Sequence, residues 1–269
     1  MSVVDEGWRR TSPVGDGAAD PRLRKLLVLE IVVVLAASFG RSGLSALIDL
    51  AGSLTAKASL NQQRATLNGS LSPRPWLDLA WQVFYIGSGL VPVLLVAYLL
   101  LREQESLRAL GFDGRDKVRD LYRGAGVAAV IGGTGLALYL AAHAMGLALT
   151  VVPTTLPDVW WRVPVLVGSA FQNAIAEEVV VLGFLLRRFD QLGWGRWRSD
   201  LTSSAIRGSY HLYQGFGGFV GNFAMGMIFA RLYRRWGRVM PLVVAHGLID
   251  TVTFVGYVYL AGRVSWLPR

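Results

Sequence analysis

The chain of 269 residues contains no cysteine. This absence excludes disulfide bonds, thiolate zinc sites, a cysteine nucleophile, and prenylation or palmitoylation of the chain itself. Charged residues are also sparse, at 17%, whereas soluble domains carry roughly a quarter. The alternating ten-residue strands of a membrane barrel are missing too, because the apolar residues come in continuous runs. The composition thus argues against a soluble domain and against a membrane barrel.

What the chain does have is long apolar blocks. Hydrophobic residues make up 53% of the sequence, and the mean hydropathy is +0.42. Blocks near the length that spans a hydrocarbon core, about 20 residues, are expected to be helices, because lipid leaves no other partner for backbone polar groups. We predict an all-α, polytopic transmembrane bundle of about seven helices over 26–269, preceded by a flexible cytoplasmic tail, 1–25. The predicted helices are 26–50, 77–101, 121–149, 162–187, 200–214, 217–233 and 240–260.

The distribution of Lys and Arg predicts the orientation, since cytoplasmic loops carry an excess of both. The tail and the segments 102–123, 187–198 and 231–238 together contain 19 basic residues, whereas the alternate segments contain 6. The N-terminus is therefore predicted to be cytoplasmic. This also explains the net charge of +9 without nucleic acid as a partner. We expect a multi-pass protein of the bacterial plasma membrane, with segment 102–123 on the membrane surface facing anionic lipid. The sequence does not indicate an oligomeric state.

Several polar residues lie within the apolar blocks after residue 160. A charge near the bilayer centre costs about 2.5–3.5 kcal/mol on insertion scales, so such residues usually face a protein interior or a water-filled cavity. Counted from the cytoplasmic ends of their helices, four of the ionisable ones lie roughly 12–18 Å deep at about 1.5 Å per residue, namely Glu177, His211, His246 and Asp250. A common depth predicts one buried polar site. The residues concerned are Glu177, Glu178, Arg207, His211, Asn222, His246 and Asp250.

Local spacing adds detail to this site. His246 and Asp250 are four residues apart and share one helical face. Asn173 lies one turn before Glu177, where it could hold the Glu177 carboxylate. Glu177 and Glu178 are about 100° apart around the helix, so one is expected to face a cavity and the other to pair with a neighbouring helix.

A carboxylate beside an imidazole in a pocket of low dielectric can deprotonate water. A second imidazole with a polar partner could stabilise the oxyanion of a tetrahedral intermediate. Together these groups suggest a hydrolase without a serine or cysteine nucleophile. Two His with Glu and Asp could also bind zinc, which is the minor alternative because the HExxH pattern of zincins is absent.

Glu177-Glu178, then His211, then His246-x-x-x-Asp250 resemble the CPBP family of intramembrane proteases, also called the CAAX protease or ABI family. The family pattern is EExxxR, FxxxH, then HxxxN or HxxxD, and the similar region is about 160–255. The surrounding AEEVVVLGFLLRRF and IRGSYHLYQG resemble an actinobacterial branch. The resemblance implies an endopeptidase that needs no metal or cofactor and cleaves a membrane-associated peptide or protein. It further implies that Glu177 and His211 activate water, that His246 and Asp250 stabilise the oxyanion, and that Glu178 supports them.

Two positions depart from the family pattern. Position 182, where the pattern has arginine, is Leu182, and position 207, where it has phenylalanine, is Arg207. We therefore hypothesise that Arg207 takes over the role of the missing arginine and pairs with Glu178. Asn222 either lines the site or makes an interhelical hydrogen bond.

Two other functions remain open. Leu182 favours a non-enzymatic immunity or scaffold protein that retains the family site. Buried Glu, His and Asp also occur in the proton relays of transporters, although the inverted repeats common in transporters are not visible.

Overall fold

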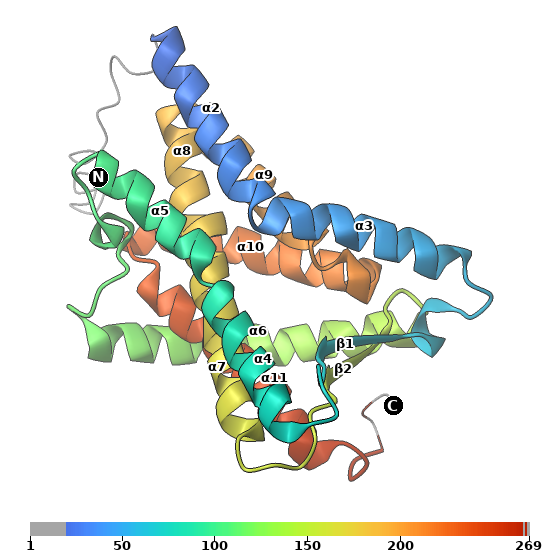
Figure 1. Ribbon diagram of the computed structural model, residues 1–269. Helices are drawn as coiled ribbons and strands as arrows, with labels where there is room; N and C mark the ends of the chain where they lie inside the picture. Colours follow the sequence, from blue (N-terminus) through green and yellow to red (C-terminus); the bar gives the residue numbers. More distant parts are fainter. Residues whose placement is uncertain (1–19, 266, 268–269) are drawn as a thin grey trace.

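The computed structural model describes residues 20–265 and residue 267 (Figure 1), and these form a mainly helical protein. The predicted all-α class is confirmed, with one small addition of strand. The α-helices are α2 (Pro21–Ala36), α3 (Phe39–Thr55), α4 (Pro75–Ser88), α5 (Val91–Arg102), α6 (Lys117–Ala144), α7 (Arg162–Glu177), α8 (Leu185–Gln191), α9 (Arg196–Ser209), α10 (Phe216–Trp236) and α11 (Met240–Leu260). A π-helical segment, Glu178–Phe184, joins α7 to α8, and short 3-10 turns occupy Leu60–Gln62, Leu107–Leu110 and Leu212–Gln214.

Four helical stretches are long and apolar enough to cross a membrane, so the chain is a multi-pass membrane protein. They are Pro75–Arg102, Lys117–Ala144, Arg162–Gln191 and Met240–Leu260. Each corresponds to one predicted block. The other three predicted blocks are also helical, but the helices in them are shorter or more polar.

The prediction of one helix over 26–50 was wrong. The chain leaves the helical conformation at Ser38, with φ −143° and ψ −121°, so that α2 and α3 are separate helices. α2 also begins earlier than predicted, because Asp20 accepts a hydrogen bond from the Arg22 backbone N–H at 2.8 Å and Pro21 occupies the first helical position, where its missing N–H costs nothing. Residues 20–25 therefore do not belong to the expected tail, and 1–19 lie outside the described residues.

Two strands hold one end of the bundle together. β1 (Arg64–Asn68) follows α3, β2 (Thr150–Thr154) follows α6, and the two pair in parallel with Arg64 opposite Thr150. They lie side by side in Figure 1. The pairing brings together 51–76 and 150–162, two segments poor in Lys and Arg that alternate with the basic segments. The charge distribution predicts that both lie on the side of the membrane opposite the basic segments.

Ion pairs connect the basic segments at the other end. Arg188, whose side chain is fully buried, lies 2.8 Å from both Glu30 and Glu103, and thus links α8 to α2 and to the residue after α5. The α7–α8 rod starts near β2 and ends at this cluster, so the two ends lie at opposite extremes of one helix (Figure 1). Further pairs at this end are Arg187–Glu105, Arg234–Asp190, Arg234–Asp200, Arg238–Asp113 and Arg238–Asp120.

The main core surrounds the π-helical segment. Every residue from Glu178 to Phe184 is buried, and the segment packs against α5, α9 and α10 while α7 packs along α11. The middle of the α7–α8 rod is therefore shielded from lipid. This is the part of the chain that carries the two adjacent glutamates.

Candidate active site

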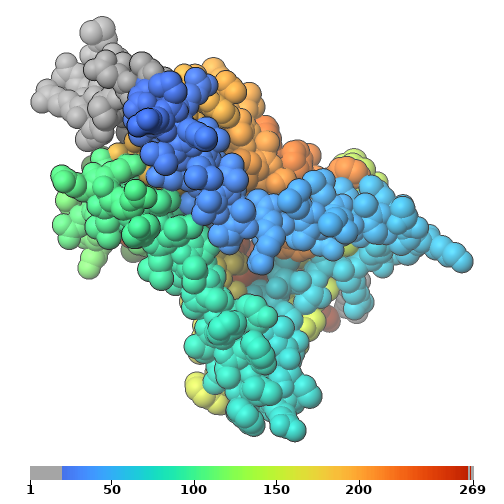
Figure 2. All heavy atoms as spheres, turned by 45° about the horizontal axis from the view of Figure 1, so that its top comes forward, coloured from blue at the N-terminus to red at the C-terminus, as the bar shows by residue number. Residues whose placement is uncertain are grey.

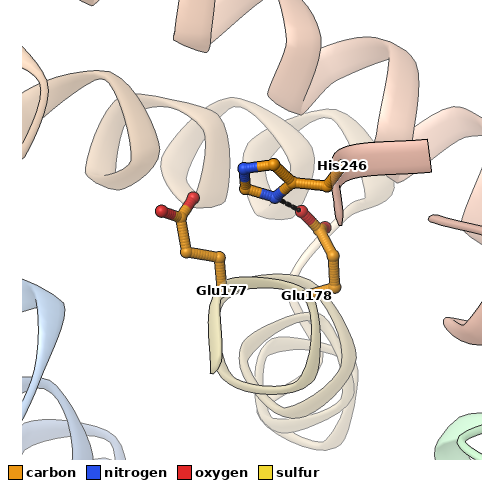
Figure 3. A group of neighbouring side chains, drawn as sticks. All are labelled: Glu177, Glu178 and His246. Carbon is orange, nitrogen blue, oxygen red and sulfur yellow. Dashed lines mark hydrogen bonds and ion pairs between the residues drawn. The ribbon is translucent and has the colours of Figure 1, made fainter. Parts of the chain in front are cut away.

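Glu177 and Glu178 stand where α7 becomes the π-helical segment. Glu177 is 7% exposed and Glu178 is fully buried. Their carboxylates leave the helix in different directions, and only that of Glu178 reaches His246 (Figure 3). A π-helical turn accommodates an extra residue and often marks a functional site. The sequence analysis did not find this turn, because no residue type signals it.

Glu178 pairs with two neighbouring helices. The Nη2 of Arg207, on α9, donates to both carboxylate oxygens at 2.7 Å. The Nδ1 of His246, on α11, lies 2.8 Å from Oε1. The predicted ion pair between Arg207 and Glu178 is thus present, and Arg207 is 1% exposed. Leu182 is buried in the apolar core instead.

Glu177 faces the other side and has one constrained oxygen. The Tyr210 hydroxyl donates to Oε2 at 2.8 Å, and the Arg207 Nη1 lies 3.6 Å from the same oxygen. The second oxygen, Oε1, is 3.9 Å from His211 Nε2. That nitrogen is buried, and within residues 20–265 and 267 it has no hydrogen-bond partner. The gap is too long for a direct hydrogen bond, but a water at about 2.8 Å from each atom could bridge it.

The prediction of a helix over 200–214 placed His211 on that helix, and this was wrong. α9 ends at Ser209, and His211 lies in the turn that leads to α10. The turn requires small residues: Gly215 has φ +91°, and a Cβ on Gly218 would come within 2.6 Å of the His211 carbonyl oxygen. The Gln214 amide, 3.4 Å from His211 Nδ1, contacts the far side of the ring.

The hairpin of α9 and α10 is fixed at its tip by the segment before β2. The Leu149 N–H donates to the Gln214 carbonyl at 3.0 Å, and the Gly217 N–H donates to the Leu147 carbonyl at 3.0 Å. At the same place the ring of Tyr210 packs on Phe39 of α3, with centroids 4.8 Å apart. Contacts from two distant parts of the chain, the segment before β2 and α3, therefore hold Tyr210 and His211 against Glu177.

α11 contributes His246 and Asp250, as their spacing predicted. His246 Nε2 lies 3.6 Å from Asp250 Oδ2, while its Nδ1 is engaged by Glu178. The Asn173 side chain lies beside Asp250, and the hydrogen bonds found within residues 20–265 and 267 do not include the expected one from its amide to Glu177. The structure therefore brings Glu177, Glu178, His211, His246 and Asp250 together, with Arg207 and Asn173 beside them.

Asn222 is the predicted supporting residue that the structure assigns elsewhere. Its amide donates to the carbonyl of Gly218, one turn earlier in α10, at 3.0 Å.

The sequence analysis missed Tyr210, although this residue contacts Glu177 directly. Its only signal in the sequence is its position next to His211, because the FxxxH pattern leaves the residue at this position unspecified.

A cation would find donor atoms in this cluster, but also a competing charge. One ligand atom from each of Glu177, Glu178 and His246 lies within 4.8 Å of the others. However, the Arg207 guanidinium already contacts both oxygens of Glu178. A divalent ion would have to displace this buried cation or be repelled by it. The residues present therefore fit a metal poorly.

Comparison with known proteins now adds to this geometry. Residues 158–252 match the model of the family described as type II CAAX prenyl endopeptidase Rce1-like. This segment of the chain is similar to that family. The match contains all five predicted catalytic residues and confirms the resemblance to the CAAX-type protease family, whereas the actinobacterial branch and the bacterial membrane stay predictions. No curated protein and no solved structure matches the chain.

Proposed function

We propose that the chain is an intramembrane endopeptidase in which Glu177 and His211 activate a water molecule to cleave a membrane-associated peptide or protein. One observation supports this most directly. Glu177 Oε1 and His211 Nε2, which is buried and has no hydrogen-bond partner in the described part of the chain, face each other across 3.9 Å, a gap that one water can bridge. The Rce1-like match at the level of the protease family agrees with this assignment.

The water oxygen attacks the scissile carbonyl carbon while its proton passes to Glu177. Tyr210 holds Oε2, so Oε1 is the oxygen that takes this proton. When the tetrahedral intermediate collapses, the C–N bond breaks and Glu177 returns the proton to the leaving amine. Neither step requires a covalent bond between enzyme and substrate.

The other residues stabilise charge in this proposal. His246 turns Nε2 towards the site because its Nδ1 faces Glu178, and in its doubly protonated form it donates from Nε2 to the oxyanion. Asp250 and Asn173 orient that ring and its surroundings. Glu178 acts as a supporting carboxylate, neutralised by Arg207. We expect the reaction to be independent of metal ions, because Arg207 supplies the positive charge at this place.

The test is cleavage by the purified protein in lipid nanodiscs. Wild type is compared with Glu177→Gln, which keeps the size of the side chain, and with Asp158→Asn, an exposed carboxylate far from the site. A pooled library of prenylated and unprenylated peptides is read by mass spectrometry, with and without a chelator. We expect wild type and Asp158→Asn to cleave in both conditions and Glu177→Gln to lose at least a thousandfold in rate, within the range seen when essential catalytic groups are removed.

If Glu177→Gln cleaves at the rate of the wild type, the proposed role of Glu177 is refuted. If the chelator abolishes cleavage by the wild type, the result favours a zinc site. If no variant cleaves any peptide, the immunity or scaffold function is tested next, by asking whether Glu177→Gln preserves the biological effect. Proton-coupled flux in proteoliposomes that depends on Glu177 would instead support the transporter.

A further inference from the structure

A pocket of about 560 Å³ lies at the basic end of the bundle, away from the active site. It is formed by the end of α5, the turn at Leu107–Leu110 and the start of α8. Three of its lining residues are arginines, Arg108, Arg115 and Arg187, against a single acid, Glu105. The volume lies within the range typical of sites for small ligands, about 300–1,000 Å³.

The charges in this pocket are only partly neutralised. Arg187 forms an ion pair with Glu105, but its Nε is buried and, among the atoms of the described chain, has no hydrogen-bond partner. The Arg115 side chain is 69% exposed, and its Nε lies 3.8 Å from Asp113 Oδ2, which is a long distance for an ion pair. Arg108 is also exposed. The pocket therefore offers guanidinium donors to an anion that the protein itself does not supply.

An apolar stripe leads up to the pocket along α5. Val91, Leu94, Tyr98 and Leu101 recur at intervals of three and four residues, so they share one face of the helix. They are 55%, 66%, 57% and 64% exposed, and Leu101 also lines the pocket. At 1.5 Å per residue the stripe is about 15 Å long, roughly half of a hydrocarbon core of about 30 Å. This is the depth of one leaflet.

The surroundings place the pocket at the membrane surface. It begins where the apolar span Pro75–Arg102 ends, and it belongs to segment 102–123, which is rich in basic residues. In Figure 2 the green surface around this segment is open to the outside beside the blue surface of α2. A ligand with a phosphate at the surface and a hydrocarbon chain in the leaflet matches both the arginines and the stripe.

We propose that this arginine pocket binds the phosphate of an anionic phospholipid, with one acyl chain along the stripe of α5. The exposed guanidinium groups of Arg108 and Arg115 donate to the phosphate oxygens, and Arg187 adds positive charge beside them. Glu105 keeps Arg187 in place and leaves the pocket with an excess of positive charge. Basic pockets of this kind at the cytoplasmic ends of membrane helices recognise lipid head groups. The inference does not depend on the proposed protease activity.

The experiment is native mass spectrometry of the full chain released from nanodiscs that contain equal amounts of phosphatidylglycerol and phosphatidylcholine with identical acyl chains. The test variant is Arg108→Gln/Arg115→Gln. Its matched control is Arg231→Gln/Arg235→Gln, two exposed arginines of α10 at the same end of the bundle, which removes the same charge. General attraction to an anionic surface is lost equally by both variants. Only the test variant also loses direct guanidinium hydrogen bonds to the lipid phosphate, each of which contributes about tenfold to binding, so its selectivity for phosphatidylglycerol should fall at least about tenfold further than that of the control.

Two further arms complete the test. Leu94→Asn should weaken retention of either lipid by interrupting the stripe, without changing the charge preference. Inorganic phosphate, added at millimolar concentration to the wild type in detergent, should displace little of the bound lipid. Equal loss of selectivity in the test variant and the control would overturn the proposal, because it would show a general effect of surface charge. Complete displacement by inorganic phosphate would show that a soluble anion, not a lipid, is the ligand.

Discussion

The Nη2 of Arg207 donates to both carboxylate oxygens of Glu178, at 2.7 Å each, although the two residues are 29 positions apart in the chain. Both side chains are buried. The CPBP pattern has an arginine at the position of Leu182, on the same helix as the glutamates, whereas here the arginine comes from α9. The site therefore keeps the positive charge beside Glu178 but takes it from a different helix, which removes the main argument for a non-enzymatic relic.

A paired exchange would test this relationship. Arg207→Phe should leave the buried Glu178 carboxylate without its guanidinium partner, with only His246 beside it, and lower the free energy of unfolding by about 3–5 kcal/mol, with loss of peptide cleavage. Adding Leu182→Arg restores both residues of the family pattern, and the double variant should recover part of both losses. Thermal melts in detergent and cleavage assays check the two effects.

If the double variant is as stable as the wild type but as inactive as Arg207→Phe, an arginine at position 182 cannot replace Arg207 in catalysis, and the prediction is wrong. Arg207→Lys serves as the conservative control, because lysine keeps the charge but not the donation to two oxygens. It should retain more stability than Arg207→Phe.

The hydrogen bond from Tyr210 to Glu177 predicts a positioning role. Tyr210→Phe removes one donor and leaves the ring against Phe39, so kcat should fall about tenfold, the equivalent of one hydrogen bond to a charged group, with KM nearly unchanged. Tyr213→Phe is the control. The Tyr213 hydroxyl accepts from Gln214 at 2.9 Å and makes no direct hydrogen bond to Glu177. Equal effects of the two substitutions on kcat would argue against a specific role for Tyr210.

Arg188 is expected to contribute far more to stability than a surface arginine. It is buried between Glu30 and Glu103, so Arg188→Ala leaves two carboxylates without their common partner and should cost about 3–5 kcal/mol. Arg115 is 69% exposed and lies 3.8 Å from Asp113, so Arg115→Ala should cost less than about 1 kcal/mol. Melting temperatures of both variants in the same detergent make the comparison, and similar values would show that the buried cluster is not a structural tie.

The orientation can be measured directly because the chain has no cysteine. Lys57→Cys and Asp158→Cys lie near the paired strands, whereas Lys117→Cys and Arg235→Cys lie at the basic end. A thiol reagent that does not cross membranes should label the first pair from outside intact cells and the second pair only after lysis. Labelling of all four from the same side would contradict the predicted topology.

The sequence predicted the helical class and the position of most helices, because long apolar blocks have few alternatives in lipid. It also predicted the convergence of Glu178, Arg207 and His246, since buried charges at a common depth must find partners. What it could not predict depends on contacts between distant segments. The chain breaks at Ser38, where Gly40 lets the backbone approach the Leu35 carbonyl, because a Cβ on Gly40 would come within 2.8 Å of that oxygen. Asn173 lies beside Asp250 of α11, and Asn222 hydrogen-bonds within its own helix.

The proposed catalytic pair illustrates the same division. Glu177 and His211 were chosen from motifs, but the 3.9 Å gap between them depends on the end of α9 at Ser209 and on the tight turn before Gly215. The π-helical turn after Glu177, which sends the two glutamates towards different partners, likewise follows from packing in the core. No local pattern of residues in the sequence specifies either feature.

The parallel pairing of β1 with β2 also constrains the order of assembly. Asn68 and Thr154 lie opposite each other, and the chain between them contains α4, α5 and α6, including two complete membrane spans. The ladder can close only after both spans have been inserted and both strands have arrived on the same side of the membrane. Once closed, the ladder connects the end of α3 to the segment that leads into α7, the helix that carries Glu177. The site can therefore take its final shape only in a chain whose preceding helices have the correct topology.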